Sequence, residues 1–112
     1  MTVREVERYG IYLANLDPTV GSEMKKVRPV AVVSPNAMNR YLNTIVICPL
    51  TSKLHSSWRS RVYTAWSEKG AEIAVDQIRT ISKVRLIKQL GKLSSGEGGK
   101  VQRLISELYG DG

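Results

Sequence analysis

Short apolar runs alternate with clusters of turn-forming residues along most of the chain. Runs of this length, bounded by Pro, Gly, Asn, Asp and Ser, predict β-strands in a compact β-rich domain. The polar segments 19–27 and 51–60 predict loops, and 82–85 predicts a short helical turn. The predicted strands cover residues 10–16, 29–33, 43–49, 61–66, 71–75, 78–81 and 86–90.

The last segment predicts an amphipathic helix. Ser94 and Glu97 have the spacing of a capping box, and Gly110 suits a helix end, although Gly98 and Gly99 weaken the first turn by about 1 kcal/mol each relative to Ala. In a chain of 112 residues, many strands and one final helix predict a single domain, residues 1–112, built as a small barrel with a packed helix. The apolar stripe of the helix consists of Val101, Leu104, Ile105 and Leu108.

The chain has a formal net charge of +7, from 17 Lys and Arg against 10 Asp and Glu. An excess of cations favours polyanionic partners, because each Lys or Arg that meets a nucleic-acid phosphate releases a condensed counterion. A basic surface kept for solubility is the alternative. Charge therefore indicates nucleic acid without establishing it.

Cys48 and His55 are the only cysteine and histidine, so the usual Cys/His zinc site cannot be built. Cys48 lies in an apolar run that predicts a buried strand, and no paired Asp/Glu motif suggests magnesium. We expect neither a metal nor a cofactor. The N-terminus lacks a signal-peptide pattern and no apolar run approaches the ~20 residues that span a bilayer, which predicts a cytoplasmic protein without a membrane partner.

Polar side chains suited to RNA cleavage lie at the ends of predicted strands. When no metal takes part, the RNA 2′-hydroxyl attacks the adjacent phosphorus, and the protein must hold the phosphate and stabilise its charge. Arg28 could bind two phosphate oxygens through its planar guanidinium, and Thr51 and Ser52 could add hydroxyl hydrogen bonds. The alternative is that Arg28 is a surface cation and Thr51 a turn residue.

A second polar group, Asp76-Gln77-Ile78-Arg79, interrupts an otherwise apolar extended region. Arg79 could hold a second phosphate and Gln77 could contact a base edge. The alternative for this group is an ordinary ion pair or an exposed strand face.

The loop 51–60 carries the remaining candidates. His55 is interpreted as a polar loop residue rather than a general acid or base. Trp58 and Tyr63 could stack on unpaired bases. Trp58 could equally cover the barrel or take part in a subunit contact.

Four motifs, in order and at compatible spacing, resemble those of the MazF/PemK toxin family. The first two are Leu-Asp-Pro-Thr-Val-Gly-Ser-Glu at 16–23 and Arg-Pro-Val-Ala-Val-Val-Ser at 28–34. The third is Pro-Leu-Thr-Ser at 49–52 and the fourth is Asp-Gln-Ile-Arg-Thr-Ile at 76–81. Together they span nearly the whole chain. Further matches follow at Lys83, 85–86, 90–91 and 93–94.

The resemblance implies a mainly β fold with α, namely a small SH3-like (CcdB/PemK-type) β-barrel with a C-terminal helix, assembled as a homodimer. It implies the toxin of a type II toxin–antitoxin system. The activity would be metal-independent, sequence-specific endoribonuclease cleavage of single-stranded RNA, with 2′,3′-cyclic phosphate and 5′-hydroxyl ends, inhibiting translation and growth. The cognate antitoxin would cover the RNA groove with an acidic tail.

By motif, Arg28 matches the family's catalytic arginine, with roles in proton transfer and phosphorane stabilisation. Thr51 matches the threonine that supports the oxyanion. An arginine is a poor base at its usual pKa, so proton transfer has the weaker physical basis of the two roles. The positions expected to contact RNA are Glu23, Ser52, Asp76, Gln77 and Arg79.

The chain departs from the family at Arg8-Tyr9-Gly10, where members commonly read Arg-Gly-Asp. The loop 51–60 varies widely within the family, so the RNA target sequence does not transfer. Two other functions fit such a fold: a non-catalytic CcdB-like poison that binds a protein such as DNA gyrase, and a module that binds RNA and leaves it intact. Arg28 with Thr51 favours the ribonuclease over the poison, because a protein-binding poison needs no phosphate-clamping pair.

Overall fold

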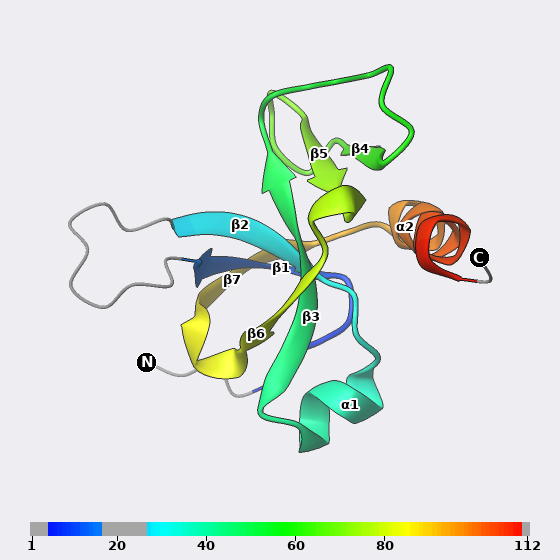
Figure 1. The fold of residues 1–112 in the computed structure, drawn as a ribbon. Helices are drawn as coiled ribbons and strands as arrows, with labels where there is room; N and C mark the ends of the chain where they lie inside the picture. Colours follow the sequence, from blue (N-terminus) through cyan, green and yellow to red (C-terminus); the bar gives the residue numbers. More distant parts are fainter. Residues whose placement is uncertain (1–4, 17–26, 111–112) are drawn as a thin grey trace.

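The computed structural model describes residues 5–16 and 27–110, in which seven strands and two α-helices are present (Figure 1). Figure 1 shows β4 and β5 at one end of the molecule and α1 at the other. In chain order the elements are β1 (Gly10–Asn15), β2 (Val27–Val32), α1 (Asn36–Tyr41), β3 (Thr44–Thr51), β4 (Arg61–Thr64), β5 (Ala71–Ala74), the 3-10 turn η1 (Val75–Gln77), β6 (Arg79–Ser82), the 3-10 turn η2 (Lys83–Arg85), β7 (Leu86–Lys92) and α2 (Ser95–Tyr109).

Every predicted strand is present, with ends that differ by a few residues. The predicted helical turn is η2, and 52–60 contains no strand or helix. Of the predicted loop 19–27, residues 19–26 lie outside the described residues, and Val27 already begins β2.

The helix α1 is absent from the prediction because it has no apolar stripe. Asn39 is its only buried residue. The Asn39 side-chain amide donates to the Ser34 carbonyl at 2.8 Å, and the Ser34 hydroxyl accepts from the Val46 backbone N–H at 3.1 Å. A buried polar network therefore fixes this helix, and hydrophobic periodicity could not have found it.

The strands form one antiparallel sheet in the order β4-β5-β3-β2-β1-β7, with β6 paired to β3. The eight-residue β3 pairs along one side with β2; on its other side it pairs first with β6, through 44–47, and then with β5, through 50–51. Among the described strands the pairing is an open path that does not link β4 to β7. The fold is the predicted small, barrel-like, mainly β structure with a C-terminal helix.

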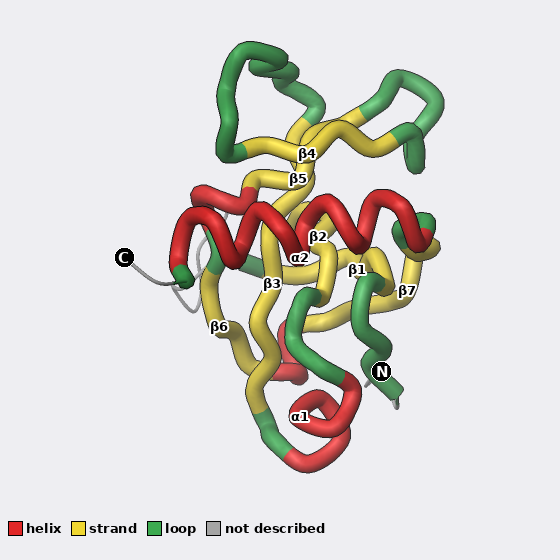
Figure 2. Tube along the Cα trace, turned by 90° about the vertical axis from the view of Figure 1, so that its right-hand side faces the viewer, coloured by secondary structure: helices red, strands yellow, loops and turns green. Residues whose placement is uncertain are grey.

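Alternate residues of the strands pack into two separate cores. Val30 and Val32 of β2 lie in the first core with Tyr12 and Ile47, whereas Ala31 lies in the second. This is the two-residue period of a strand that is buried on both faces. The second core also takes in α2, which crosses one face of the strands (Figure 2).

The helix α2 has the predicted capping box, in which the Ser94 hydroxyl accepts from the Glu97 backbone N–H and the Glu97 carboxylate accepts from the Ser94 N–H. Val101 and Leu104 are buried as predicted. Ile105 packs against the same core, whereas Leu108 is 43% exposed. Neither helix in the described part of the chain is long and apolar enough to cross a bilayer.

Gly98, predicted only to weaken the helix, makes room for Tyr9. A Cβ at Gly98 would lie 2.8 Å from the Tyr9 ring. Tyr9 itself has a backbone φ of +67°, a value that residues other than glycine rarely adopt. Its backbone N–H donates to the Val32 carbonyl at 2.6 Å, and this hydrogen bond holds the conformation. At Gly10, a Cβ would lie 2.6 Å from the Tyr12 ring, so an acidic side chain at this position would displace Tyr12.

Candidate functional site

A pocket of about 610 Å³ lies where β2 begins and β3 ends. It is lined by Arg28, Thr51 and Ser52, three of the seven residues predicted for the site. Its walls come from β2 (Arg28 and Pro29), from the end of β3 and the following loop (Leu50, Thr51, Ser52 and Lys53), and from the β4–β5 connection with the start of β5 (Trp66, Ser67, Gly70 and Ala71).

The antiparallel register of β2 and β3 brings Arg28 and Thr51 to the same edge. Val30 lies opposite Pro49 in that register. Arg28 stands two residues before Val30, and Thr51 stands two residues after Pro49. Because side chains alternate with a period of two, both residues point to the same face as that pair.

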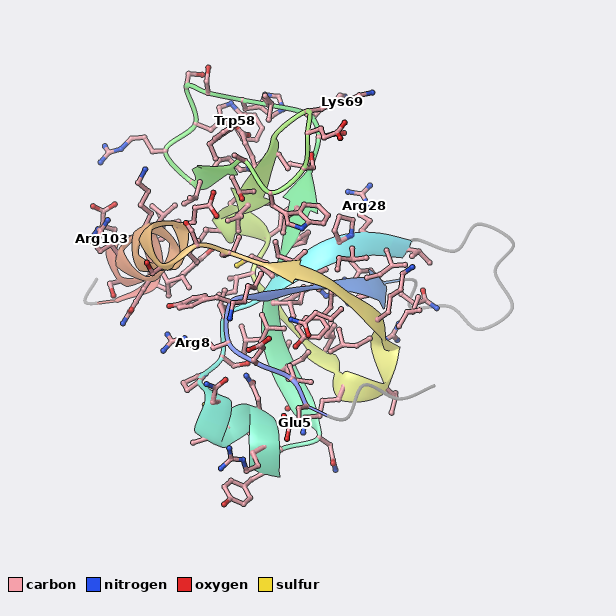
Figure 3. The ribbon with its side chains drawn as sticks, turned by 180° about the vertical axis from the view of Figure 1, so that it is seen from behind. Glu5, Arg8, Arg28, Trp58, Lys69 and Arg103 are labelled. Carbon is pink, nitrogen blue, oxygen red and sulfur yellow. The ribbon has the colours of Figure 1, made fainter. Side chains whose placement is uncertain are left out.

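Arg28 is exposed, and among the described residues it has no ion-pair partner. Figure 3 shows its side chain rising from β2 towards the end of the molecule that carries Lys69 and Trp58. A guanidinium without a carboxylate partner keeps its donors available to an anion, and its planar fork matches two phosphate oxygens.

Thr51 is half-buried and its hydroxyl accepts a hydrogen bond from the Lys53 backbone N–H at 3.1 Å. Because the hydroxyl oxygen is the acceptor here, its proton stays available to donate to a ligand oxygen. Ser52 and Lys53 are exposed at the same rim. The pocket thus presents a guanidinium, an ammonium and hydroxyl donors, which suits a phosphate.

Trp66 and Lys53 line the pocket although the sequence interpretation did not select them. The half-buried Trp66 indole packs against Gly91 of β7, where a Cβ would lie 2.7 Å from Trp66 Nε1. Lys53 could have been selected from the sequence, because it is a basic residue directly after the candidate Ser52. No local signal marks Trp66, because its position depends on β7.

The other predicted residues do not line this pocket. Glu23 lies outside the described residues, Asp76 and Gln77 are in η1, and the exposed Arg79 is on β6 opposite Ile47. These three residues lie on the side of β3 that pairs with β5 and β6, whereas Arg28 lies on the side that pairs with β2.

An ion pair was one of the interpretations of the segment 76–79, and Asp76 forms one. Arg61 Nε lies 2.8 Å from Asp76 Oδ1. Partial burial raises the pKa of Asp76, but hydrogen bonds from Arg61 and Ser60 outweigh this effect and hold the pKa below its usual value.

Cys48 is fully buried, as predicted. Burial, with a smaller contribution from Asp76, raises the pKa of its thiol to about 12, so the thiol is unreactive at neutral pH. Within 5–16 and 27–110, no group of three or more His, Cys, Asp or Glu side chains is arranged to hold a metal ion.

A family model described as PemK-like, MazF-like toxin of type II toxin–antitoxin systems matches residues 7–109. The match includes both strands that bring Arg28 and Thr51 to the pocket, and it also includes α2.

Solved structures with the same fold include MazF from Deinococcus radiodurans, with a TM-score of 0.77 and 22% identity over 96% of this chain and 98% of that one. A MazE–MazF complex from the same organism has a TM-score of 0.79 and 22% identity, covering 96% and 98% of the two chains. An endoribonuclease from a mycobacterial species has a TM-score of 0.76 and 20% identity, covering 96% and 92%. At these identities the likeness shows a shared fold.

Proposed function

This chain belongs to the PemK-like, MazF-like toxins of type II toxin–antitoxin systems, and from that premise we propose that it is an endoribonuclease that cuts single-stranded RNA without a metal. The observation that carries the proposal is that Arg28 and Thr51 line the same pocket. Arg28 has no ion-pair partner among the described residues, and Thr51 has a hydroxyl proton to donate.

The reaction uses the RNA as its own nucleophile. The 2′-oxygen forms a bond to the adjacent phosphorus while the bond from phosphorus to the 5′-oxygen breaks, which leaves a 2′,3′-cyclic phosphate and a 5′-hydroxyl. Arg28 pairs with the non-bridging oxygens of the phosphorane, and Thr51 donates a hydrogen bond to the same oxygens. A guanidinium is a poor general base, so the 2′-hydroxyl proton passes to water and the leaving oxygen takes a proton from water.

The remaining lining residues fit a single-stranded nucleic acid. Trp66 offers an aromatic surface on which an unpaired base can stack, and Lys53 and Ser52 can hold the neighbouring phosphate. Glu23, Asp76, Gln77 and Arg79 are proposed to contact RNA further along its path, with Asp76 acting through its ion pair with Arg61.

The partner proposed for this chain is an antitoxin with an acidic segment. A net charge of +7 favours such a segment as well as RNA. MazF is seen with MazE in a structure of the same fold from Deinococcus radiodurans. We further propose that two copies of this chain assemble as a homodimer, and that cleavage is specific for a short RNA sequence and arrests translation.

The deciding experiment is cleavage of a long, mixed-sequence RNA in excess chelator by the native chain, Arg28→Ala and Arg103→Ala. Arg103 is an exposed cation on α2, away from Arg28 (Figure 3), so its variant controls for the loss of one positive charge. We expect the native chain and Arg103→Ala to cut at the same few sites, and Arg28→Ala to lose about 10²-fold in rate. If none of them cuts RNA while the native chain still arrests bacterial growth, the gyrase-type poison becomes the better account.

A further inference from the structure

Glu72 is a carboxylate buried beneath the loop 52–60. It lies on β5 directly opposite Thr51 of β3, and the residue is 4% exposed. A buried charge is costly unless hydrogen bonds and an opposite charge compensate it. Its partners therefore show what the carboxylate holds in place.

Glu72 has two partners, one within the loop and one directly after it. Its Oε1 accepts a hydrogen bond from the His55 backbone N–H at 2.8 Å and lies 3.6 Å from Arg61 Nη1. The Arg61 side chain is 6% exposed, so this ion pair is largely removed from water. One carboxylate thus contacts both the middle of the loop and the start of β4, where Arg61 is also held by Asp76 at 2.8 Å.

Aromatic contacts connect the two partners of Glu72, His55 and Arg61, to each other through Trp58. The Arg61 guanidinium lies over the Trp58 ring, 4.6 Å from its centroid. Trp58 in turn stacks on His55, with centroids 3.9 Å apart and an angle of 9° between the rings. The Trp58 backbone N–H also donates to the His55 backbone carbonyl at 2.9 Å. His55, Trp58, Arg61 and Glu72 form a closed ring of contacts, which we name the loop clamp.

The loop clamp lies next to the part of the loop that lines the pocket. Lys53 is two residues from His55, and its N–H bonds to the Thr51 hydroxyl. Fixing His55 therefore limits where Ser52 and Lys53 can lie. Glu72 itself does not line the pocket, so it has no direct path to a bound phosphate.

We propose that Glu72 is a positioning residue, which through the loop clamp holds Ser52 and Lys53 at the rim where RNA binds. The proposal rests on the ribonuclease function proposed above. Preorganisation of this kind lowers the entropy lost when the substrate binds. Loss of the clamp should therefore raise KM more than it lowers kcat, because Arg28 and Thr51 remain held by their strands.

The test compares Glu72→Ala, Glu72→Gln and Trp58→Leu with the native chain, with Glu107→Gln as control. Glu107 is an exposed carboxylate on α2 and is not part of the clamp. Two quantities are measured: hydrogen exchange at the His55 amide, and KM and kcat for cleavage of one short RNA. Trp58 is 46% exposed, so Trp58→Leu breaks the ring without opening a core and remains informative if Glu72→Ala does not fold.

For Glu72→Ala we expect His55 exchange about tenfold faster and KM about tenfold higher, with kcat within about threefold of native. Trp58→Leu should also raise the His55 exchange rate and KM. Glu72→Gln should bring both quantities most of the way back to the native values, because its amide oxygen can accept a hydrogen bond from the His55 N–H. Unchanged His55 exchange and KM in the folded variants would overturn the proposal, and so would a fall in kcat at constant KM. If the native chain leaves RNA intact, the ribonuclease function fails, and His55 exchange in the variants still decides whether Glu72 holds the loop.

Discussion

The indole of Trp66 occupies the space that Gly91 leaves without a side chain: a Cβ on Gly91 would lie 2.7 Å from Trp66 Nε1. The contact joins the β4–β5 connection to β7 and sets one wall of the pocket around Arg28. Trp66 is therefore held by the sheet rather than by its own loop, which suits a rigid platform for a base.

Trp66→Leu should weaken binding of single-stranded RNA, since stacking of a base on an aromatic side chain contributes about 1–3 kcal/mol. The expected rise in Kd is roughly 5- to 150-fold, measured by fluorescence anisotropy with a labelled RNA that carries a 2′-deoxy nucleotide at the cleavage site. Tyr41→Leu is the matched control, because Tyr41 is a 79% exposed aromatic residue on α1, at the opposite end of the molecule (Figure 1). An equal loss in both variants, or no loss in Trp66→Leu, would rule out stacking on Trp66.

Arg28→Lys should fail to restore activity although it preserves the charge. The ammonium is a point charge and cannot pair with two phosphorane oxygens as the planar guanidinium can. We expect a rate within about tenfold of Arg28→Ala under single-turnover conditions, with RNA affinity close to native because the charge remains. A Lys variant that cuts at the native rate would show that charge alone suffices at this position.

A 2′-deoxy nucleotide at the scissile position should abolish cutting and leave RNA binding intact. The proposed nucleophile is then missing, whereas the phosphate that Arg28 binds is still present. Gel analysis of the substituted strand next to its all-ribose parent gives the answer. Cleavage of the substituted strand would require an external nucleophile such as water and would exclude 2′-hydroxyl attack.

Local sequence patterns predict the strands and the reactive residues of this site, but they do not predict how the strands are arranged against one another. The apolar runs predict the strands, and the Ser94–Glu97 spacing predicts the cap of α2, because both patterns are local. The chemistry of Arg28 and Thr51 could also be proposed from their places at strand ends. That they share a pocket depends on the register of β2 against β3, which local pattern does not determine.

Residues whose role depends on distant partners were missed or left open. Trp66 needs Gly91, and Glu72 needs His55 and Arg61, all from other segments. Asp76 could be a ligand contact or an ion-pair member until the Arg61 contact of 2.8 Å was seen. Such non-local pairings arise from the tertiary fold, and the sequence of each segment alone carries little trace of them.

Glu97 makes the stability of the fold depend on pH in the acid range. Partial burial raises the pKa of Glu97, but hydrogen bonds from the Ser94 and Ala65 backbone and from the Thr64 side chain outweigh it, so the folded pKa lies below the ordinary value of 4.5. A lowered folded pKa means that the unfolded chain binds the proton more tightly. The stabilisation is therefore complete above the ordinary value and is lost as the pH falls through the folded pKa.

Glu97→Gln tests this assignment, because the amide cannot titrate and keeps one oxygen that can accept from the Ser94 N–H, although its NH2 group cannot accept from the Ala65 N–H as the second carboxylate oxygen does. We expect native and variant to differ most at pH 7, by roughly 0.3–1 kcal/mol in the free energy of unfolding because water screens the largely exposed carboxylate, and to converge as the pH falls through the folded pKa of Glu97. Urea unfolding at several pH values measures the difference, with Glu107→Gln on the exposed face of α2 as control. A constant gap between native and Glu97→Gln at every pH would mean that the Glu97 charge does not stabilise the cap, and that the carboxylate acts there only through the second acceptor oxygen that the amide lacks.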